Sequence, residues 1–214
     1  MLKSAFKKQM TQDLMELNIN QTIAKAIAAD VCRDMSKQEL YYHGINHPVD
    51  MFKFATKNNI KLNIEQKIAI WFHDKITNPL YGKYNEKLSA LYMEACLAQH
   101  VDSTFIANVK KHILATECHA LNEEQLLKID FHQDSLTIMD LDLHSFTNQK
   151  SFNFNKKLLI KEYKAFKIKD YKINMINFYK KLIEREFVFR TQTFIWGFNS
   201  NAKSILKNEL NNAK

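Results

Sequence analysis

The chain has 214 residues, of which 46% are hydrophobic and 25% are charged, and its net charge is +8. It contains only 3 glycines and 2 prolines, which argues against a strand-rich fold, because such folds need many turn residues. No run reaches the ~18 apolar residues of a membrane span, and the first residues lack the apolar core of a signal peptide. We therefore expect an all-α protein with no membrane partner.

Apolar residues recur at three-to-four spacing along nearly the whole chain, which is the spacing of an α-helix. Asn63 followed by Gln66 predicts a capping box, and Pro48 suits the first turn of another helix, with His47 next to its N-cap. Residues 186–198 are expected to be irregular or briefly extended. In chain order the expected helices span residues 4–17, 20–35, 48–57, 63–75, 85–99, 103–117, 122–130, 136–146, 152–168, 170–189 and 200–212.

Cysteine usage indicates a reducing environment. The chain has 3 cysteines, an odd number, and no C-x-x-C pair. This pattern favours reduced thiols in a cytoplasmic compartment over a disulfide framework. It also argues against a closed structural zinc site. The cysteines are Cys32, Cys96 and Cys118.

The predicted helix at 63–75 is apolar over most of its circumference. Such a helix is expected to be central and buried rather than on the surface. His73 and Asp74 lie near its end, so an imidazole and a carboxylate should lie near the interior. A buried carboxylate is costly unless it is paired, hydrogen-bonded or bound to a metal. Something inside the protein should therefore neutralise Asp74.

Four polar clusters interrupt the apolar helical pattern. Imidazoles and carboxylates together suit Mn, Fe, Co, Ni or Zn as a divalent metal, with Mg also possible. Each cluster alone is weak, because a core histidine or a helix-capping acid explains it as well. The clusters are His43 and His47; His73 and Asp74; His112, Thr116 and His119; and Asp140 and Asp142.

Five ordered motifs span most of the chain: Y-H-x-x-x-H at 42–47, A-x-x-F-H-D at 69–74, N-E-x-x-S-A at 85–90, I-x-x-T-x-x-H at 113–119 and D-x-D-L at 140–143. This order resembles the HD superfamily of metal-dependent phosphohydrolases, and in particular a small bacterial family of predicted metal-dependent HD phosphohydrolases. The resemblance implies an HD-domain-like helical bundle with additional C-terminal helices. A single domain over 1–214 is expected, with a motif core at about 40–146 and a C-terminal extension at about 150–214.

The resemblance also implies roles for individual residues. The expected reaction is hydrolysis of a phosphate ester of a nucleotide or another small phosphorylated metabolite. Glu86 is a candidate general acid/base or orienting residue, although an acid in a first helical turn also simply complements the helix dipole. The expected metal ligands are His47, His73, Asp74 and Asp142, with Asp140 as the alternative to Asp142. The expected catalytic residues are Asp74, Glu86 and His119, and the expected substrate contacts are His43, His112, Lys75 and Lys83.

Two other functions stay open at the level of sequence. One is a non-catalytic HD-fold module that binds metal or senses a nucleotide. The other is RNA binding through residues 156–190, where 11 Lys and Arg stand against 4 Asp and Glu. The aromatic residues of that segment are spaced for burial rather than for stacking on bases, so we rank RNA binding last. The expected partner is a small phosphorylated substrate, and the oligomeric state is left open.

Overall fold

The computed structural model describes residues 2–130 and 132–213, except for the side chain of Lys83. Over these residues the chain is helical and contains no strand, so the prediction of an all-α fold is confirmed. The helices are α1 (Leu2–Met15), α2 (Gln21–Asp34), α3 (Asn46–Lys57), α4 (Ile64–Phe72), α5 (Asn85–Leu97), α6 (Ser103–Ala115), α7 (Glu123–Leu126), α8 (Ser135–Asp142), α9 (Gln149–Ala165), α10 (Tyr171–Glu184) and α11 (Gln192–Asn211). Short 3-10 helices are η1 (Gly82–Tyr84), η2 (Thr116–Cys118) and η3 (His144–Thr147).

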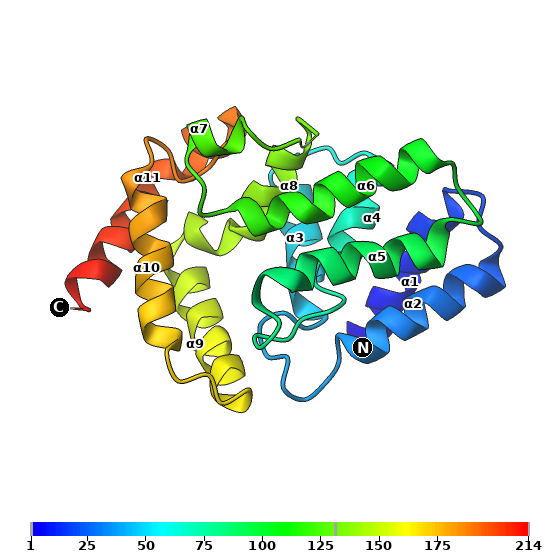
Figure 1. Ribbon diagram of the computed structural model, residues 1–214, viewed down its shortest axis with the longest axis horizontal. Helices are drawn as coiled ribbons and strands as arrows, with labels where there is room; N and C mark the ends of the chain where they lie inside the picture. The colour runs from blue at the N-terminus through cyan, green and yellow to red at the C-terminus, as the bar shows by residue number, and fades with distance from the viewer. Residues whose placement is uncertain (1, 131, 214) are drawn as a thin grey trace.

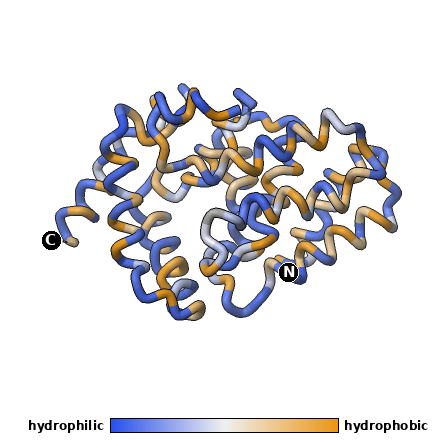
Figure 2. Tube along the Cα trace, viewed as in Figure 1, coloured by the Kyte–Doolittle hydropathy of each residue, from blue (hydrophilic) through white to orange (hydrophobic). Residues whose placement is uncertain are grey.

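The bundle is elongated, with α1 and α2 at one end and α9, α10 and α11 at the other (Figure 1). Helices α3, α4 and α8 lie between these ends and contact one another. The main hydrophobic core extends from Phe6 in α1 to Leu206 in α11, and Ala115, Leu126 and Met139 form a second, smaller cluster. Hydrophobic and hydrophilic positions alternate around most of the helices, as amphipathic packing requires (Figure 2).

Most predicted helix ends agree with the structure within a few residues, but the start of the last helix was wrong. Helix α11 begins at Gln192 instead of at residue 200, and α10 already ends at Glu184. The aromatic and β-branched residues of 186–198 favour an extended segment locally, and its glycine disfavours a helix. Phe194 is 1% exposed and packs against Phe189 and Phe198, so tertiary burial overrides this local preference.

Helix α4 is the buried centre of the bundle, as predicted. The Asn63 side chain accepts a hydrogen bond from the backbone N–H of Gln66 at 2.8 Å, and the Gln66 side chain accepts one from Asn63 at 3.0 Å. This capping box fixes where the helix starts. Residues 68–72 are at most 1% exposed. Because the helix ends at Phe72, His73 and Asp74 follow directly at its interior end.

Trp71 connects α4 to the N-terminal helices. Its ring packs against Phe6 of α1 and Phe52 of α3. Its indole N–H donates a hydrogen bond of 2.7 Å to the buried carboxylate of Asp13, and Lys67 lies 3.5 Å from the same carboxylate. The polar end of the tryptophan and the buried acid therefore satisfy each other.

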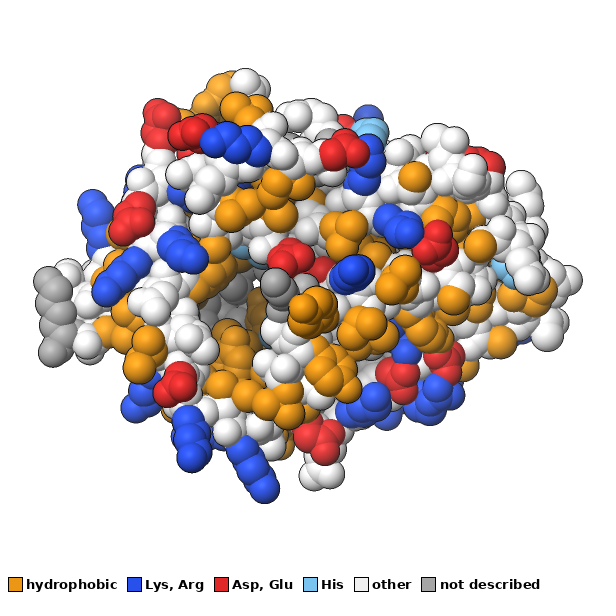
Figure 3. All heavy atoms as spheres, viewed as in Figure 1, with side chains coloured by type: hydrophobic (Ala, Val, Ile, Leu, Met, Phe, Trp, Pro, Cys, Tyr) orange, Lys and Arg blue, Asp and Glu red, His pale blue; other side chains and the backbone are white. Residues whose placement is uncertain are grey.

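The face shown in Figure 3 is hollowed between the α9–α10 pair and the rest of the bundle, and hydrophobic side chains gather around the hollow. A cavity of about 320 Å³ opens there. No helix in the described ranges combines the length and the apolar character needed to cross a membrane. The three cysteines are free thiols.

Candidate metal centre

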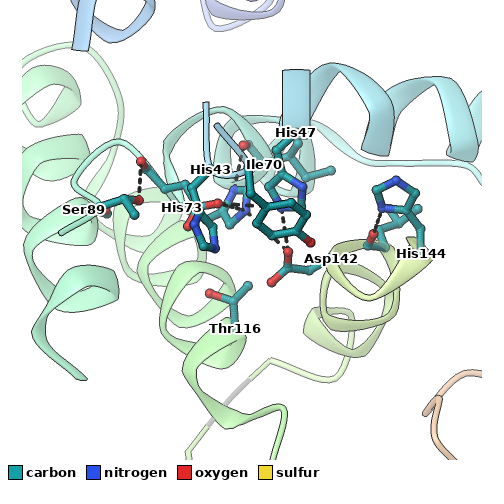
Figure 4. A network of polar contacts seen from close by, with 12 residues as sticks. His43, His47, Ile70, His73, Ser89, Thr116, Asp142 and His144 are labelled. Atoms are coloured by element: carbon teal, nitrogen blue, oxygen red, sulfur yellow. Dashed lines mark hydrogen bonds and ion pairs between the residues drawn. The ribbon is translucent and has the colours of Figure 1, made fainter. Parts of the chain in front are cut away.

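Three helix ends bring the predicted metal ligands together. His47 lies in the first turn of α3, where Pro48 is tolerated because the first N–H groups of a helix need no intrahelical partner. His73 caps the C-terminal end of α4 and is followed by Asp74, and Asp142 is the last residue of α8. Figure 4 shows His47, His73 and Asp142 turned toward one another at the meeting point of these helices.

The distances within this group are short. The Nε2 atom of His47 lies 2.7 Å from Oδ1 of Asp142 and 3.6 Å from Oδ2 of Asp74. The Nε2 atom of His73 lies 3.1 Å from Oδ2 of Asp74 and 3.8 Å from Oδ1 of Asp142. One ligand atom each from His47, His73 and Asp74 lies within 4.8 Å of the others, so this group could hold a metal ion.

The free atoms of the group have the character of metal ligands. The Nδ1–H of His73 donates to the carbonyl of Ile70 at 2.9 Å, so Nε2 is the ring nitrogen that faces the group. Metal-binding histidines commonly donate their other ring N–H in this way. His73 Nε2 and Asp74 Oδ2 are both buried and make no hydrogen bond of acceptable geometry. Buried atoms left without a partner are costly, and a bound cation would satisfy both.

The electrostatics of the group also demand positive charge. Asp74 and Asp142 lie at the C-terminal ends of α4 and α8, where the helix dipole disfavours an anion. Within the described side chains, no Lys or Arg forms an ion pair with either carboxylate, and only imidazoles do. Burial alone would lower the pKa of His73, but Asp74 and Asp142 outweigh it and raise the pKa to about 9.

The structure distinguishes Asp142 from Asp140. Asp140 is 1% exposed, and its carboxylate accepts hydrogen bonds from the backbone N–H of Arg190 at 2.8 Å and of Thr191 at 2.7 Å, and from the Thr191 hydroxyl at 2.7 Å. Asp140 therefore anchors the segment before α11. Only Asp142 faces the histidines. Burial would raise the pKa of Asp142, but hydrogen bonds from His119 and His47 hold it well below its usual range.

His119, predicted to be catalytic, also reaches the group. Its Nε2 lies 2.7 Å from Oδ2 of Asp142, and its Nδ1 is buried without a hydrogen-bond partner. The guanidinium of Arg185 donates to its backbone carbonyl at 2.7 Å. Asp142 thus lies between two imidazoles, with one carboxylate oxygen toward His47 and the other toward His119.

Glu86 lies in the first turn of α5 with one carboxylate oxygen, Oε2, buried and without a hydrogen-bond partner. Burial raises the pKa of its carboxyl, and the nearby negative charges of Asp74 and Asp142 raise it further. A carboxyl with a raised pKa close to a candidate metal group can hold and release a proton. The catalytic role of Glu86 stays a prediction.

Other residues of the N-E-x-x-S-A motif hold the loop that follows Asp74. The side chain of Asn85 accepts a hydrogen bond from the backbone N–H of Asn78 at 3.0 Å. The Ser89 hydroxyl accepts one from Ile76 at 3.0 Å. These two bonds tie α5 to the end of α4, and so they support the position of Asp74.

Glu162 is a site residue that sequence reasoning missed. It lies in α9, is 0% exposed, and accepts hydrogen bonds from the backbone N–H groups of Tyr42 at 2.8 Å and His43 at 3.0 Å. Its other oxygen lies 2.5 Å from His43 Nδ1. Burial would lower the pKa of His43, but Glu162 outweighs it, and the Asp74 carboxylate adds to raise the pKa to about 10. The imidazole of His43 is therefore cationic at neutral pH.

Gly44 lets the same loop pack closely. A Cβ at this position would lie 2.7 Å from the carbonyl oxygen of Leu40 and 3.0 Å from that of Met35. Both contacts are with backbone, which cannot move aside easily. The glycine in Y-H-G thus has a packing reason: only a residue without a side chain allows the loop to present His43 and His47 from adjacent turns.

Two predicted substrate contacts are corrected by the structure. Lys75 is 5% exposed, and its ammonium forms an ion pair with Asp34, lies 3.7 Å from Asp30 and lies 3.9 Å above the ring of Tyr92. It is therefore part of the contact between α2 and α5 and is not available to a phosphate. The prediction followed its position next to Asp74, but adjacent side chains on a helical turn point in different directions.

His112 is the second correction. It is 0% exposed, its Nδ1 lies 2.8 Å from the Ser135 hydroxyl, and its ring packs against His132. It does not line the cavity. Burial and His132 lower its pKa to about 4, so it is a neutral core histidine. The side chain of Lys83 lies outside the described part of the chain.

The cavity adjoins the metal group at one end. Tyr42, His43, His119 and Asp142 line that end, and side chains of η3, α9 and α10 form the remaining wall. The candidate centre is therefore open to a small molecule that enters between the central helices and the α9–α10 pair, as the hollow in Figure 3 also shows.

Replacement of Glu162 by glutamine should lower the free energy of unfolding by about 3 kcal/mol, because it leaves His43 without its counter-ion. The pKa of His43 is raised, so its protonation stabilises the fold fully below pH 6.5, the ordinary pKa of histidine. This stabilisation is lost as the pH rises toward 10. Glu162 has a lowered pKa, so its contribution is lost as the pH falls below 4.5. The difference between parent and variant should therefore be largest between pH 4.5 and 6.5.

Urea denaturation at a series of pH values measures this difference. Glu184→Gln, an exposed acid at the end of α10, is the matched control and should change stability little at any pH. A pH-independent difference for Glu162→Gln would show that the pair is not ionised.

No protein-family model matches this chain. No curated protein and no solved structure matches it either. The resemblance to HD phosphohydrolases therefore stays a prediction that rests on the motifs, and the function has to be argued from the geometry of the site.

Proposed function

We propose that this protein is a metal-dependent phosphohydrolase that cleaves the phosphate ester of a small phosphorylated metabolite or a nucleotide. The observation that carries the proposal is the convergence of His47, His73 and Asp74 within 4.8 Å, next to a cavity lined by His43 and Asp142. The order of the five motifs supports the same reading.

The donor set is suited to a divalent metal. Imidazole nitrogens of His47 and His73 and carboxylate oxygens of Asp74 and Asp142 are the ligand types preferred by Mn, Fe, Co, Ni and Zn, with Mg possible. Such an ion supplies Lewis acidity toward a phosphoryl oxygen and toward water. The helices themselves orient the four side chains, because each lies at or just beyond an end of α3, α4 or α8.

His43 is the group that would hold the phosphate. Glu162 occupies its Nδ1, which leaves its Nε2–H on the opposite side of the ring, and the imidazole lines the cavity. A cationic N–H donor forms strong hydrogen bonds with phosphate oxygens. His43 would therefore bind the ester next to the metal group and stabilise the negative charge of the phosphoryl oxygens.

Glu86 and His119 would handle protons and orientation. The raised pKa of Glu86 lets its carboxyl give a proton to the leaving oxygen or take one from water. The Nε2–H of His119 donates to Asp142, which fixes the orientation of that carboxylate. These assignments use the same residues that the motifs predict.

RNA binding is disfavoured by the same structure. Stacking on unpaired bases needs exposed aromatic rings on the basic segment. Five aromatic side chains of this segment are instead buried or half-buried: Tyr163, Phe166, Tyr171, Phe178 and Tyr179.

A phosphate-release screen tests the proposed function. The purified protein is incubated with nucleotides and small phosphate monoesters in the presence of Mn, Co, Ni or Mg, and inorganic phosphate is measured. We expect release with at least one pairing of metal and substrate, and complete loss of release with excess chelator. Metal bound near one ion per chain with no release from any substrate would instead favour the non-catalytic sensor module.

A further inference from the structure

We propose that the cavity beside the metal group selects phosphate monoesters whose organic part is a flat, uncharged ring system, and that it discriminates against polyphosphates. This inference rests on the proposed function, because it assumes that one phosphate lies at the metal group. It adds the class of the leaving group, which the metal ligands do not determine.

Part of the cavity wall is aromatic. Phe146 of η3, Phe152 of α9 and Tyr179 of α10 pack with ring centroids 5.1 to 6.0 Å apart, and each is at most 6% exposed. Phe178 and Met175 extend this surface toward the opening. Flat rings and a thioether offer favourable contacts to another flat ring, and they offer no compensation to a charge.

The charges around the cavity are suited to a single phosphate. Lys156 is the one lysine or arginine among the described lining residues, and its ammonium forms an ion pair with Glu209. His43 is paired with Glu162 and adjoins the metal group, where it would serve the first phosphate. A second or third phosphate would extend toward the aromatic wall, where it would lose hydration without gaining a cation.

Polar groups in the wall are uncharged amides. Asn155 of α9 is half-buried, and both it and Asn174 of α10 line the cavity. Each amide offers a hydrogen-bond donor and an acceptor. Such groups can recognise the edge of a heterocyclic ring without requiring that the ring be charged. The volume of about 320 Å³ lies at the small end of ligand pockets, which suits one ring system better than an extended chain.

Binding of an uncharged probe tests the pocket independently of catalysis. We would titrate the metal-free full chain with 1-naphthol and follow naphthol fluorescence. Saturable binding is expected. It should weaken at least about tenfold in Phe178→Ala and be lost in Leu159→Trp, which fills the cavity from α9. Phe154→Ala, an exposed aromatic on α9 outside the cavity, is the matched control and should bind like the parent. Absence of saturable binding, or equal binding by all variants, would overturn the proposal.

Kinetics provide the second arm. With the metal that supports release, kcat/KM for 1-naphthyl phosphate should exceed that for glycerol 1-phosphate and for ATP by at least about 100-fold, a difference of ~2.7 kcal/mol. Phe178→Ala should lower kcat/KM for the naphthyl ester at least about tenfold more than for the glycerol ester. Equal preference for the two esters, or faster cleavage of ATP, would contradict the inferred specificity.

The two arms separate this inference from the proposed function. Naphthol binding that follows the variants, without release from any ester, would contradict the phosphohydrolase and leave the aryl pocket standing. Hydrolysis of both esters at equal rates, with no naphthol binding, would support the phosphohydrolase and contradict the inferred pocket for a flat ring. Thermal melts of each variant show whether a loss of binding reflects unfolding. The two pocket variants lie on different helices, so the result does not depend on the folding of a single variant.

Discussion

His73→Ala and Asp74→Ala should each release phosphate at least about 100-fold more slowly than the parent and should lose the bound metal. Residues that merely orient metal ligands cost 10- to 100-fold when they are changed, so removal of a ligand itself should cost at least as much. Each side chain offers one buried atom, Nε2 of His73 and Oδ2 of Asp74, that makes no hydrogen bond within the described structure and is free to bind a metal.

Metal content by elemental analysis and phosphate release are measured on the same samples. His100→Ala and Asp50→Asn are matched controls, since His100 is exposed and Asp50 forms only a surface pair with Lys53. Both controls should keep metal and activity. Ligand variants that are folded and release phosphate as fast as the parent would remove the basis of the proposed function.

Asp140→Ala should lower the free energy of unfolding by about 3 kcal/mol or more, while the folded protein keeps its metal. The substitution leaves the backbone N–H groups of the half-buried Arg190 and Thr191, and the Thr191 hydroxyl, without their acceptor, and each such loss costs about 1–3 kcal/mol where the group is buried. The segment that leads into α11 should loosen, because this carboxylate is what fixes it.

Asp142→Asn is the informative comparison, because it retains the shape of the side chain and one acceptor oxygen. It should lose metal and activity while it keeps most of its stability. Chemical denaturation and elemental analysis of the two variants together test the assignment. A stable Asp140→Ala variant without metal would indicate that the roles of the two aspartates are the reverse of those described.

Local signals predicted much of the fold. The capping box at Asn63 and the apolar circumference of α4 are properties of short stretches, and the structure bears out both predictions. The scarcity of glycine in the whole chain indicated an all-α fold, which the described residues confirm. The start of α11 was missed because residues 186–198 have extended preferences that only contacts with distant helices override. A single sequence does not show which partner will bury Phe194.

The candidate site was predictable to the extent that its residues lie in ordered motifs. Asp140 and Asp142 could not be separated from sequence, because the difference lies in what each carboxylate faces. Lys75 and His112 were misassigned for the same reason: both are chemically suitable, and both point toward other helices. Glu162 gave no local signal, since a lone acid among lysines usually lies on the surface, and its contacts reach residues 119 and 120 positions away.

The position of Glu162 has a consequence for how this protein can change. Helix α9 carries both the carboxylate that orients His43 and several side chains that line the cavity, among them Phe152 of the aromatic wall. A shift of α9 that reshapes the cavity wall would also move the imidazole of His43, which we propose binds the phosphate. Selectivity and turnover should therefore evolve together, and variants that alter one without the other should be found on α10 rather than on α9.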